Sequence, residues 1–275
     1  MERGGNTAVT VAGGNTGTAT LTGRFGIGSG SVAMSGLITL GDINGSHDLT
    51  MYALSSGPHY TGGIVGNGNL NVSGSGATLF LDSSGPGVNF NGTMNVGALG
   101  NTVDVSAVIG PNVTAVNQLG GTLQLRGINT YVGDTTITGG TLNLFDNAGL
   151  LFAIGTSGVN NSILGTATVN FNGDFYFDLT SAGMNLGDTW NIVNVATLNE
   201  SFGSTFTVNG FNDIGGNLWE FINGPTTYTF SESTGLLVVT AAASTVPEPG
   251  ALILAALGML GLGVVAWRRK RGTWK

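Results

Sequence analysis

The feature of this 275-residue sequence that most constrains its fold is a short alternating segment that recurs along the chain. Each copy has two apolar residues separated by one residue, which is polar in every copy except the second, where it is Phe80. The apolar pairs are Leu70/Val72, Leu79/Leu81, Met94/Val96, Val103/Val105, Leu123/Leu125, Leu142/Leu144 and Val169/Phe171. Residues two apart in a strand face the same side, so each pair predicts a strand with two apolar side chains turned inward. The pattern therefore predicts an all-β body.

The spacing of the copies indicates how these strands are stacked. Leu70 and Met94 are 24 residues apart, and Leu123 and Leu142 are 19 apart. Such periods are typical of solenoid coils. The 49 glycines agree with this, because interior glycines destabilise helices but allow tight corners between strands. We predict a right-handed parallel β-helix (solenoid), with a β-sandwich or irregular β-barrel as the alternative, because residues 1–60 repeat poorly.

One coil-length stretch carries a family resemblance. Residues 119–144, LGGTLQLRGINTYVGDTTITGGTLNL, resemble the autotransporter-associated β-helical repeat and depart from it at Val132 and Asp134, positions that are more often small in that family. The resemblance implies a β-helical coil, whose expected core residues are Leu123, Leu125, Ile137, Leu142 and Leu144. Tyr131 is expected either to stack at a corner or to be part of the core.

The sequence pattern changes near residue 180, where the expected strands become longer and richer in aromatic residues. An uncovered last coil would expose an edge strand, so these strands are expected to cap the solenoid. The predicted organisation is a repeat body at 1–179, a β-rich cap at 180–240, a linker at 241–246 and a sorting signal at 247–271.

The C-terminal tail contains a membrane-span candidate. Gly250 to Trp267 is a run of 18 residues without a charge, about 27 Å long as a helix, against about 30 Å of membrane hydrocarbon. We predict a single transmembrane helix over 250–267. Four bases follow it, Arg268, Arg269, Lys270 and Arg271, and are expected to stay cytoplasmic, which places residues 1–246 outside. The alternative is a buried apolar helix of a soluble domain.

A second resemblance rests on the whole tail. Val246, Pro247, Glu248 and Pro249 stand directly before the apolar run and the basic end, and together they resemble the tripartite PEP-CTERM sorting signal of Gram-negative and related bacteria. The resemblance implies that an exosortase-like membrane protease recognises Pro247-Glu248-Pro249. The protein would then be anchored in the inner membrane during sorting and later reach the cell surface or the medium. No secretory signal peptide is recognisable after Met1, which an upstream start or another export route would explain.

Charge and chemistry-bearing residues narrow the function. Residues 1–249 contain fifteen acidic residues and only three basic ones, which argues against nucleic-acid binding by the body. The chain has no cysteine, and His47 and His59 lie in Gly/Ser-rich contexts, where we expect exposed loop residues. Oxygen ligands alternate from Asp42 to Asp48, but the closing Glu of a calcium loop is missing. We therefore predict no catalytic residues, no metal site and no cofactor.

The leading interpretation is a non-catalytic, exported structural or adhesive protein of the cell surface or extracellular matrix, with exopolysaccharide as the partner that the sorting-signal resemblance implies. The competing one is a polysaccharide lyase or hydrolase built on a β-helix. That enzyme would need a carboxylate pair about 5–10 Å apart in a groove, or a calcium cluster with an Arg or Lys base, for which Arg24 and Arg126 are the candidates in the body. A third is a permanent single-pass membrane protein whose tail is never removed.

Overall fold

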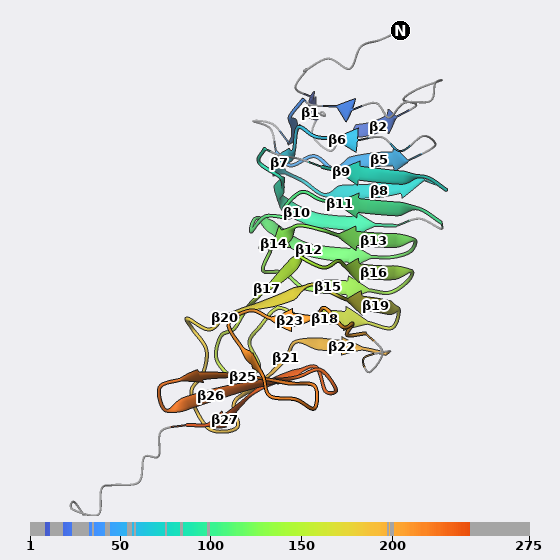
Figure 1. Cartoon of the computed structure of the whole chain (residues 1–275). Coiled ribbons are helices and arrows are strands. Elements are labelled where there is room, and N and C mark those ends of the chain that lie inside the picture. The colour runs from blue at the N-terminus through green and yellow to red at the C-terminus, as the bar shows by residue number, and fades with distance from the viewer. Residues whose placement is uncertain are drawn as a thin grey trace, which may run out of the picture. The chain divides into compact units, whose positions relative to one another are not determined.

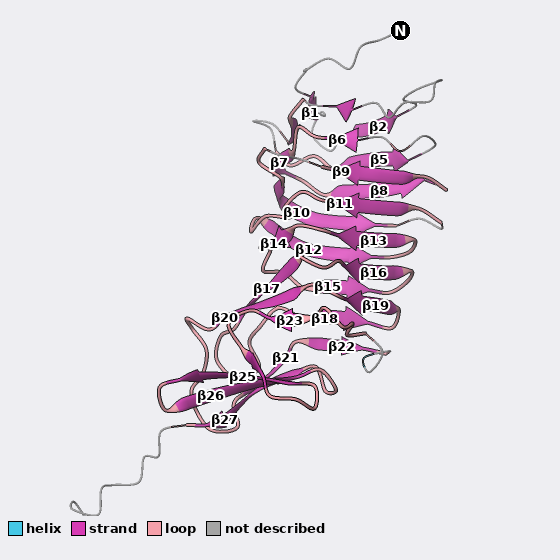
Figure 2. Ribbon diagram, in the orientation of Figure 1, coloured by secondary structure: helices cyan, strands magenta, loops and turns pink. Residues whose placement is uncertain are grey.

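The computed structural model describes residues 9–11, 19–23, 33–34, 36–41, 45–53, 57, 59–74, 76–82, 85–97, 100–196, 198 and 201–242. The chain divides into two compact units, Met1–Ala241 and Ala242–Lys275, and the described strands belong to the first. Figure 2 shows this first unit as strands joined by loops. Within the described residues, no helix is long and apolar enough to cross a membrane, and the predicted helix over 250–267 lies outside them.

Three sheets of parallel strands form the solenoid, and Figure 1 shows their strands stacked coil upon coil. The largest sheet contains β1 (Val9–Val11), β2 (Ala19–Gly23), β4 (Ile38–Leu40), β5 (Leu49–Ala53), β7 (Ile64–Asn67), β8 (Leu70–Gly74), β10 (Val88–Val96), β12 (Val113–Gln118), β15 (Thr135–Ile137), β18 (Ile163–Gly165) and β22 (Val193–Val195). The second contains β3 (Ala33–Met34), β6 (His59–Tyr60), β9 (Thr78–Leu81), β11 (Thr102–Val105), β13 (Thr122–Leu125), β16 (Thr141–Leu144) and β19 (Thr168–Phe171). The third contains β14 (Ile128–Asn129), β17 (Gly149–Ala153), β20 (Asp174–Asp178) and β23 (Thr207–Val208).

The register between coils confirms the stacking that the sequence spacing predicts. Leu70 pairs with Met94, Leu79 with Val103, and Leu123 with Leu142, all between parallel strands. A parallel solenoid is therefore confirmed for the body, and the sandwich and barrel alternatives are wrong there, because they would join neighbouring strands as antiparallel hairpins. The right-handed sense of the coil stays a prediction.

The solenoid core is built from the predicted apolar columns. All five expected core residues of the 119–144 coil are fully buried, namely Leu123, Leu125, Ile137, Leu142 and Leu144. They continue columns of buried residues in neighbouring coils, as Val103 and Val169 do on either side of Leu123 and Leu142. Each apolar side chain thus packs on the one above and below it, which removes its surface from water.

An antiparallel sheet follows the parallel ones. It contains β21 (Thr189–Asn191), β24 (Asn212–Asp213), β25 (Leu218–Asn223), β26 (Thr226–Ser231) and β27 (Leu236–Ala241). Its Phe230 lies 5.8 Å from Phe175 of β20 between ring centroids, and Trp219 lies 5.8 Å from Phe206. These rings pack the antiparallel sheet against the last coil. The strands β22 and β23 lie within the range expected for the cap but pair with solenoid strands. Strands of the last coil and strands of the antiparallel sheet therefore alternate in the sequence.

Tyr131 is a core residue, the second of the two roles expected for it. Its side chain is 3% exposed, and its hydroxyl shares a hydrogen bond of 2.6 Å with Thr135 Oγ1. Burial raises the pKa of Tyr131 to about 12, because the interior disfavours the phenolate. Burial likewise raises the pKa of Tyr60 to about 12.

These raised pKa values make the fold sensitive to alkali. An unfolded chain loses the phenol proton near pH 10, whereas the folded chain keeps it to about pH 12. The stabilising contribution is therefore complete below pH 10 and is lost as the pH rises through 12. For Tyr131 alone it amounts to roughly 2–3 kcal/mol.

We expect Tyr131→Phe to unfold about 1 kcal/mol more easily than the parent protein at pH 8, because the hydrogen bond to Thr135 is lost. Near pH 12 the order reverses, because only the parent must ionise this buried ring. Urea unfolding followed by circular dichroism at pH 8, 10 and 12 measures the difference. Tyr60 is unchanged in both proteins, so a gap that stays constant with pH would contradict the assignment.

Candidate functional site

Polar side chains form ladders along the outer surface of the solenoid. Asn71, Asn95 and Asn117 occupy equivalent positions in successive coils. The side-chain amide of Asn95 donates to Asn71 Oδ1 at 2.8 Å, and that of Asn117 donates to Asn95 Oδ1 at 2.9 Å. Each amide bonds the coil before it, so the ladder ties coils together and still keeps a partly exposed row of donors and acceptors.

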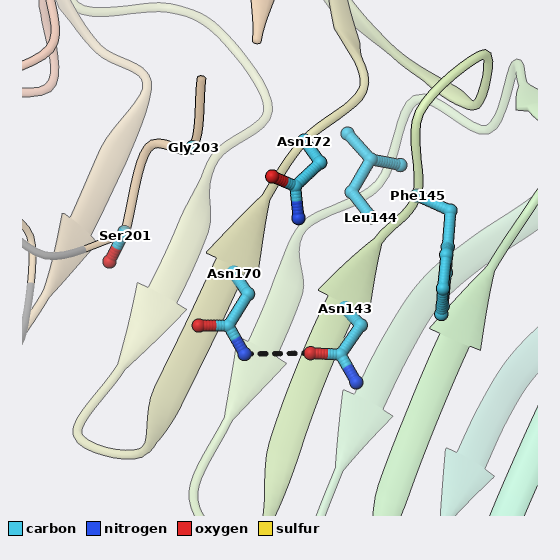
Figure 3. A pocket seen from close by; sticks show the side chains of 7 residues that line it. All are labelled: Asn143, Leu144, Phe145, Asn170, Asn172, Ser201 and Gly203. Atoms are coloured by element: carbon cyan, nitrogen blue, oxygen red, sulfur yellow. Dashed lines mark hydrogen bonds between the residues drawn. The ribbon is translucent and has the colours of Figure 1, made fainter. Parts of the chain in front are cut away.

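A second ladder leads into a groove on the outer side of the second sheet. Asn170 of β19 donates to Asn143 Oδ1 of β16 at 2.7 Å, and Figure 3 shows these amides beside Asn172. The groove has a volume of about 350 Å³. Its lining, here called the polar groove, is Asn143, Leu144, Phe145, Asn170, Asn172, Ser201 and Gly203. None of these side chains ionises, so the groove can exchange hydrogen bonds with a ligand but has no acid or base to offer it.

Arg126 lies beside this groove, and its guanidinium contacts Asp104 and Phe145. Its Nε lies 2.8 Å from Asp104 Oδ1, one coil back, and its guanidinium carbon lies 3.7 Å from the centre of the Phe145 ring. The guanidinium thus neutralises a carboxylate and covers one face of Phe145. Arg24, the other candidate base, lies outside the described residues.

The expectation that both histidines are exposed loop residues is wrong. His47 is buried, with 3% of its surface exposed. His59 belongs to β6, its ring stacks on Phe80 at 4.1 Å, and its Nδ1 bonds the carboxylate of Asp82. The His59 ring is partly covered because Phe80 and Asp82 of the next coil lie against it, a contact that the surrounding Gly and Ser residues do not reveal.

The carboxylate of Asp82 also accepts a hydrogen bond of 3.0 Å from Ser106 Oγ. The set resembles a catalytic triad in composition only, because its serine bonds the carboxylate and not the imidazole. The Ser106 hydroxyl therefore lacks the contact with an imidazole base that activates the serine of a triad.

The remaining predicted sites fall largely outside the described part of the chain. Asp42 to Asn44 of the calcium-like loop lie outside it, and the carboxylate of Asp48 accepts the backbone N–H of Asn69 at 2.8 Å. Among the described residues, no three His, Cys, Asp or Glu side chains gather closely enough to hold a metal. The sorting residues Val246, Pro247, Glu248 and Pro249 and the bases Arg268, Arg269, Lys270 and Arg271 all lie outside the described residues.

Sequence reasoning missed the asparagine ladders and the polar groove. A signal for the ladders was present, because Asn71 and Asn95 both stand between two apolar core residues and are 24 positions apart. Aligning the coils on their apolar pairs would have superposed these amides. No such signal exists for Ser201 and Gly203, which reach the groove from a coil without a recognisable repeat.

The comparisons with known proteins bear on the tail. The model of the PEP-CTERM protein-sorting motif matches residues 245–270. This motif implies processing by an exosortase, export, and sorting to the cell surface. No curated protein and no solved structure matches the chain significantly.

Proposed function

We propose that this chain is a non-catalytic structural or adhesive protein of the cell surface or extracellular matrix. The proposal rests on one observation: the sorting motif at residues 245–270 follows a β-solenoid in the sequence. Stacked parallel coils supply a rigid scaffold, because every strand is hydrogen-bonded along the stack. The amide ladders and the polar groove present donors and acceptors that suit the hydroxyl groups of exopolysaccharide.

The geometry of the grooves supports a non-catalytic role over a lyase or hydrolase. Those enzymes need two carboxylates across a groove or a free base. The polar groove contains no ionisable side chain. A groove lined by Phe202, Asn217, Glu232 and Ser233 has one carboxylate, which accepts a hydrogen bond of 2.7 Å from Trp219 Nε1. Arg126, the candidate base within the described residues, is paired with Asp104.

The proposal includes the fate of the tail and the type of coil. The coils are right-handed and of the autotransporter-associated type. Gly250–Trp267 crosses the inner membrane as a helix, and Arg268 to Arg271 hold its end in the cytoplasm. The two prolines around Glu248 keep the recognition segment extended, and therefore accessible to the protease. Cleavage near Pro247-Glu248-Pro249 then frees the body from the anchor.

The test is the intact mass of the protein recovered from the surface or medium of its native cell, after enzymatic removal of glycans. We expect the residues that follow the Pro247-Glu248-Pro249 region to be missing. Replacing these three residues by alanine should leave the full chain in the membrane fraction, whereas Ser244→Ala, a matched control just before the motif, should be processed normally. A full-length chain in the cytosol would overturn the proposal, and a full-length chain in the membrane would favour the permanent single-pass protein.

A further inference from the structure

A second groove combines partly exposed aromatic rings with exposed polar side chains. It lies where β20, the turn after β23 and β25 meet, and has a volume of about 440 Å³. We call it the aromatic groove, defined by Phe177, Phe211, Phe221, Asp178, Asn209 and Asn223. All three rings are partly exposed, although burying them fully would stabilise the fold.

The rings form a continuous apolar floor. Phe211 lies 5.4 Å from Phe177 and 5.4 Å from Phe221 between ring centroids. The planes of Phe211 and Phe221 are tilted by 32°, so these two rings lie roughly parallel, and we call this pair the platform. Phe177 joins the platform to the core, because its ring lies 5.6 Å from Phe230. The floor is therefore held rigidly from beneath.

The rim supplies hydrogen-bonding groups of both kinds. Asn209 and Asn223 are exposed, and their side chains bond no other described residue. Asp178 Oδ1 accepts Thr180 N–H at 3.0 Å and Thr180 Oγ1–H at 2.6 Å. These bonds orient the carboxylate and hold the pKa of Asp178 below its usual range, so it is ionised and accepts hydrogen bonds at neutral pH.

Flat apolar rings bordered by amides and one fixed acceptor match the surface of a sugar ring, which has an apolar face and hydroxyl groups around its edge. The negative charge of Asp178 favours neutral sugars, because it repels an anionic ligand. Arg126, the one arginine or lysine among the described residues, is paired with Asp104 on a different sheet from the groove. We propose that the aromatic groove binds a neutral polysaccharide by stacking a sugar ring on Phe211 and Phe221. The inference rests on the adhesive role proposed above, and gives that role a ligand class and a site.

The experiment is calorimetric titration of the full chain, in a detergent without a sugar headgroup, with neutral gluco-, manno- and galacto-hexasaccharides and with hexagalacturonate. We expect at least one neutral hexasaccharide to bind and hexagalacturonate to bind at least about tenfold more weakly. Phe221→Ala should weaken binding at least about tenfold, and Asn223→Ala several-fold.

The matched controls lie on β25 itself and on its neighbour β24. Ile222→Ala removes an exposed apolar side chain next to Phe221 on the opposite side of β25, and Asn212→Ala removes an exposed amide from β24, so both should bind like the parent. Asn223 is exposed, so its variant tests the groove even if Phe221→Ala unfolds.

The inference is overturned if no neutral hexasaccharide binds, if both groove variants bind normally, or if the rings bind only an apolar peptide. Export and tail processing without glycan binding would refute this inference alone, and a failure of both would refute the proposed function as well.

Discussion

Phe175→Ala is expected to lower the free energy of unfolding by about 3–5 kcal/mol, among the largest losses that a single substitution in this chain can cause. Phe175 is fully buried in β20. Six rings lie within 6.5 Å of it between centroids, namely Phe152, Phe171, Phe177, Phe202, Phe206 and Phe230. They come from the last coils and from the antiparallel sheet, so alanine leaves a cavity where these two parts join.

Urea unfolding followed by far-ultraviolet circular dichroism and by tryptophan fluorescence measures the loss. Trp190 and Trp219 report on the antiparallel sheet, and circular dichroism reports on all strands. Both transitions should move to lower urea together, because the substitution weakens the contact that couples the two parts. Phe145→Ala is the matched control, since this ring is only partly buried and mainly contacts Arg126, and should lose about 1 kcal/mol. Equal losses in the two variants would show that the ring cluster does not hold the antiparallel sheet.

The stacking of the coils could be predicted from the sequence because it depends on local rules. Apolar residues two apart fix which face of each strand is buried, and a constant spacing brings equivalent residues into register. The spacing of 24 residues between Leu79 and Val103 is the register found in the structure. The same rules explain why the five repeat-core residues, Leu123 to Leu144, are all buried.

Regions where the local rules are interrupted could not be predicted. The first half of β10 pairs with β7 and its second half with β8, and its register with β12 shifts between Gly92 and Thr93. A sequence pattern assigns each strand one partner on each side and does not reveal this branching. The antiparallel sheet is a second example, because β21 pairs with β27, and Trp190 stands opposite Leu237. No repeat relates these segments.

The aromatic groove depends even more on such long-range contacts. Phe177, Phe211 and Phe221 come from three segments of different character, and only the fold brings the Phe211 ring to 5.4 Å from each of the other two. The composition of the tail, in contrast, is sufficient for its assignment, because a sorting signal is read as linear sequence before and during processing. This is why residues 245–270 could be assigned from sequence alone, whereas the grooves required coordinates.

Gly140→Ala is expected to destabilise the protein by about 3 kcal/mol or more through the corner of the 119–144 coil. Gly140 has a φ of 78°, which costs a residue with a Cβ about 1–2 kcal/mol. A Cβ at this position would also lie 2.0 Å from Gly121 O, the backbone oxygen of the equivalent corner one coil earlier. The side chain cannot rotate away from a backbone atom, so the two coils must separate, and the hydrogen bond from Thr141 N–H to Gly121 O weakens.

Gly158→Ala separates these two causes, because Gly158 has nearly the same φ, 80°, but no atom within 4 Å of the added Cβ. It should lose only the conformational part, about 1–2 kcal/mol. Urea unfolding of both variants under one set of conditions gives the difference, which measures how closely the corners of successive coils are stacked. If the two losses are equal, the coils yield without resistance, and the close stacking that makes the solenoid a rigid scaffold is absent at its corners.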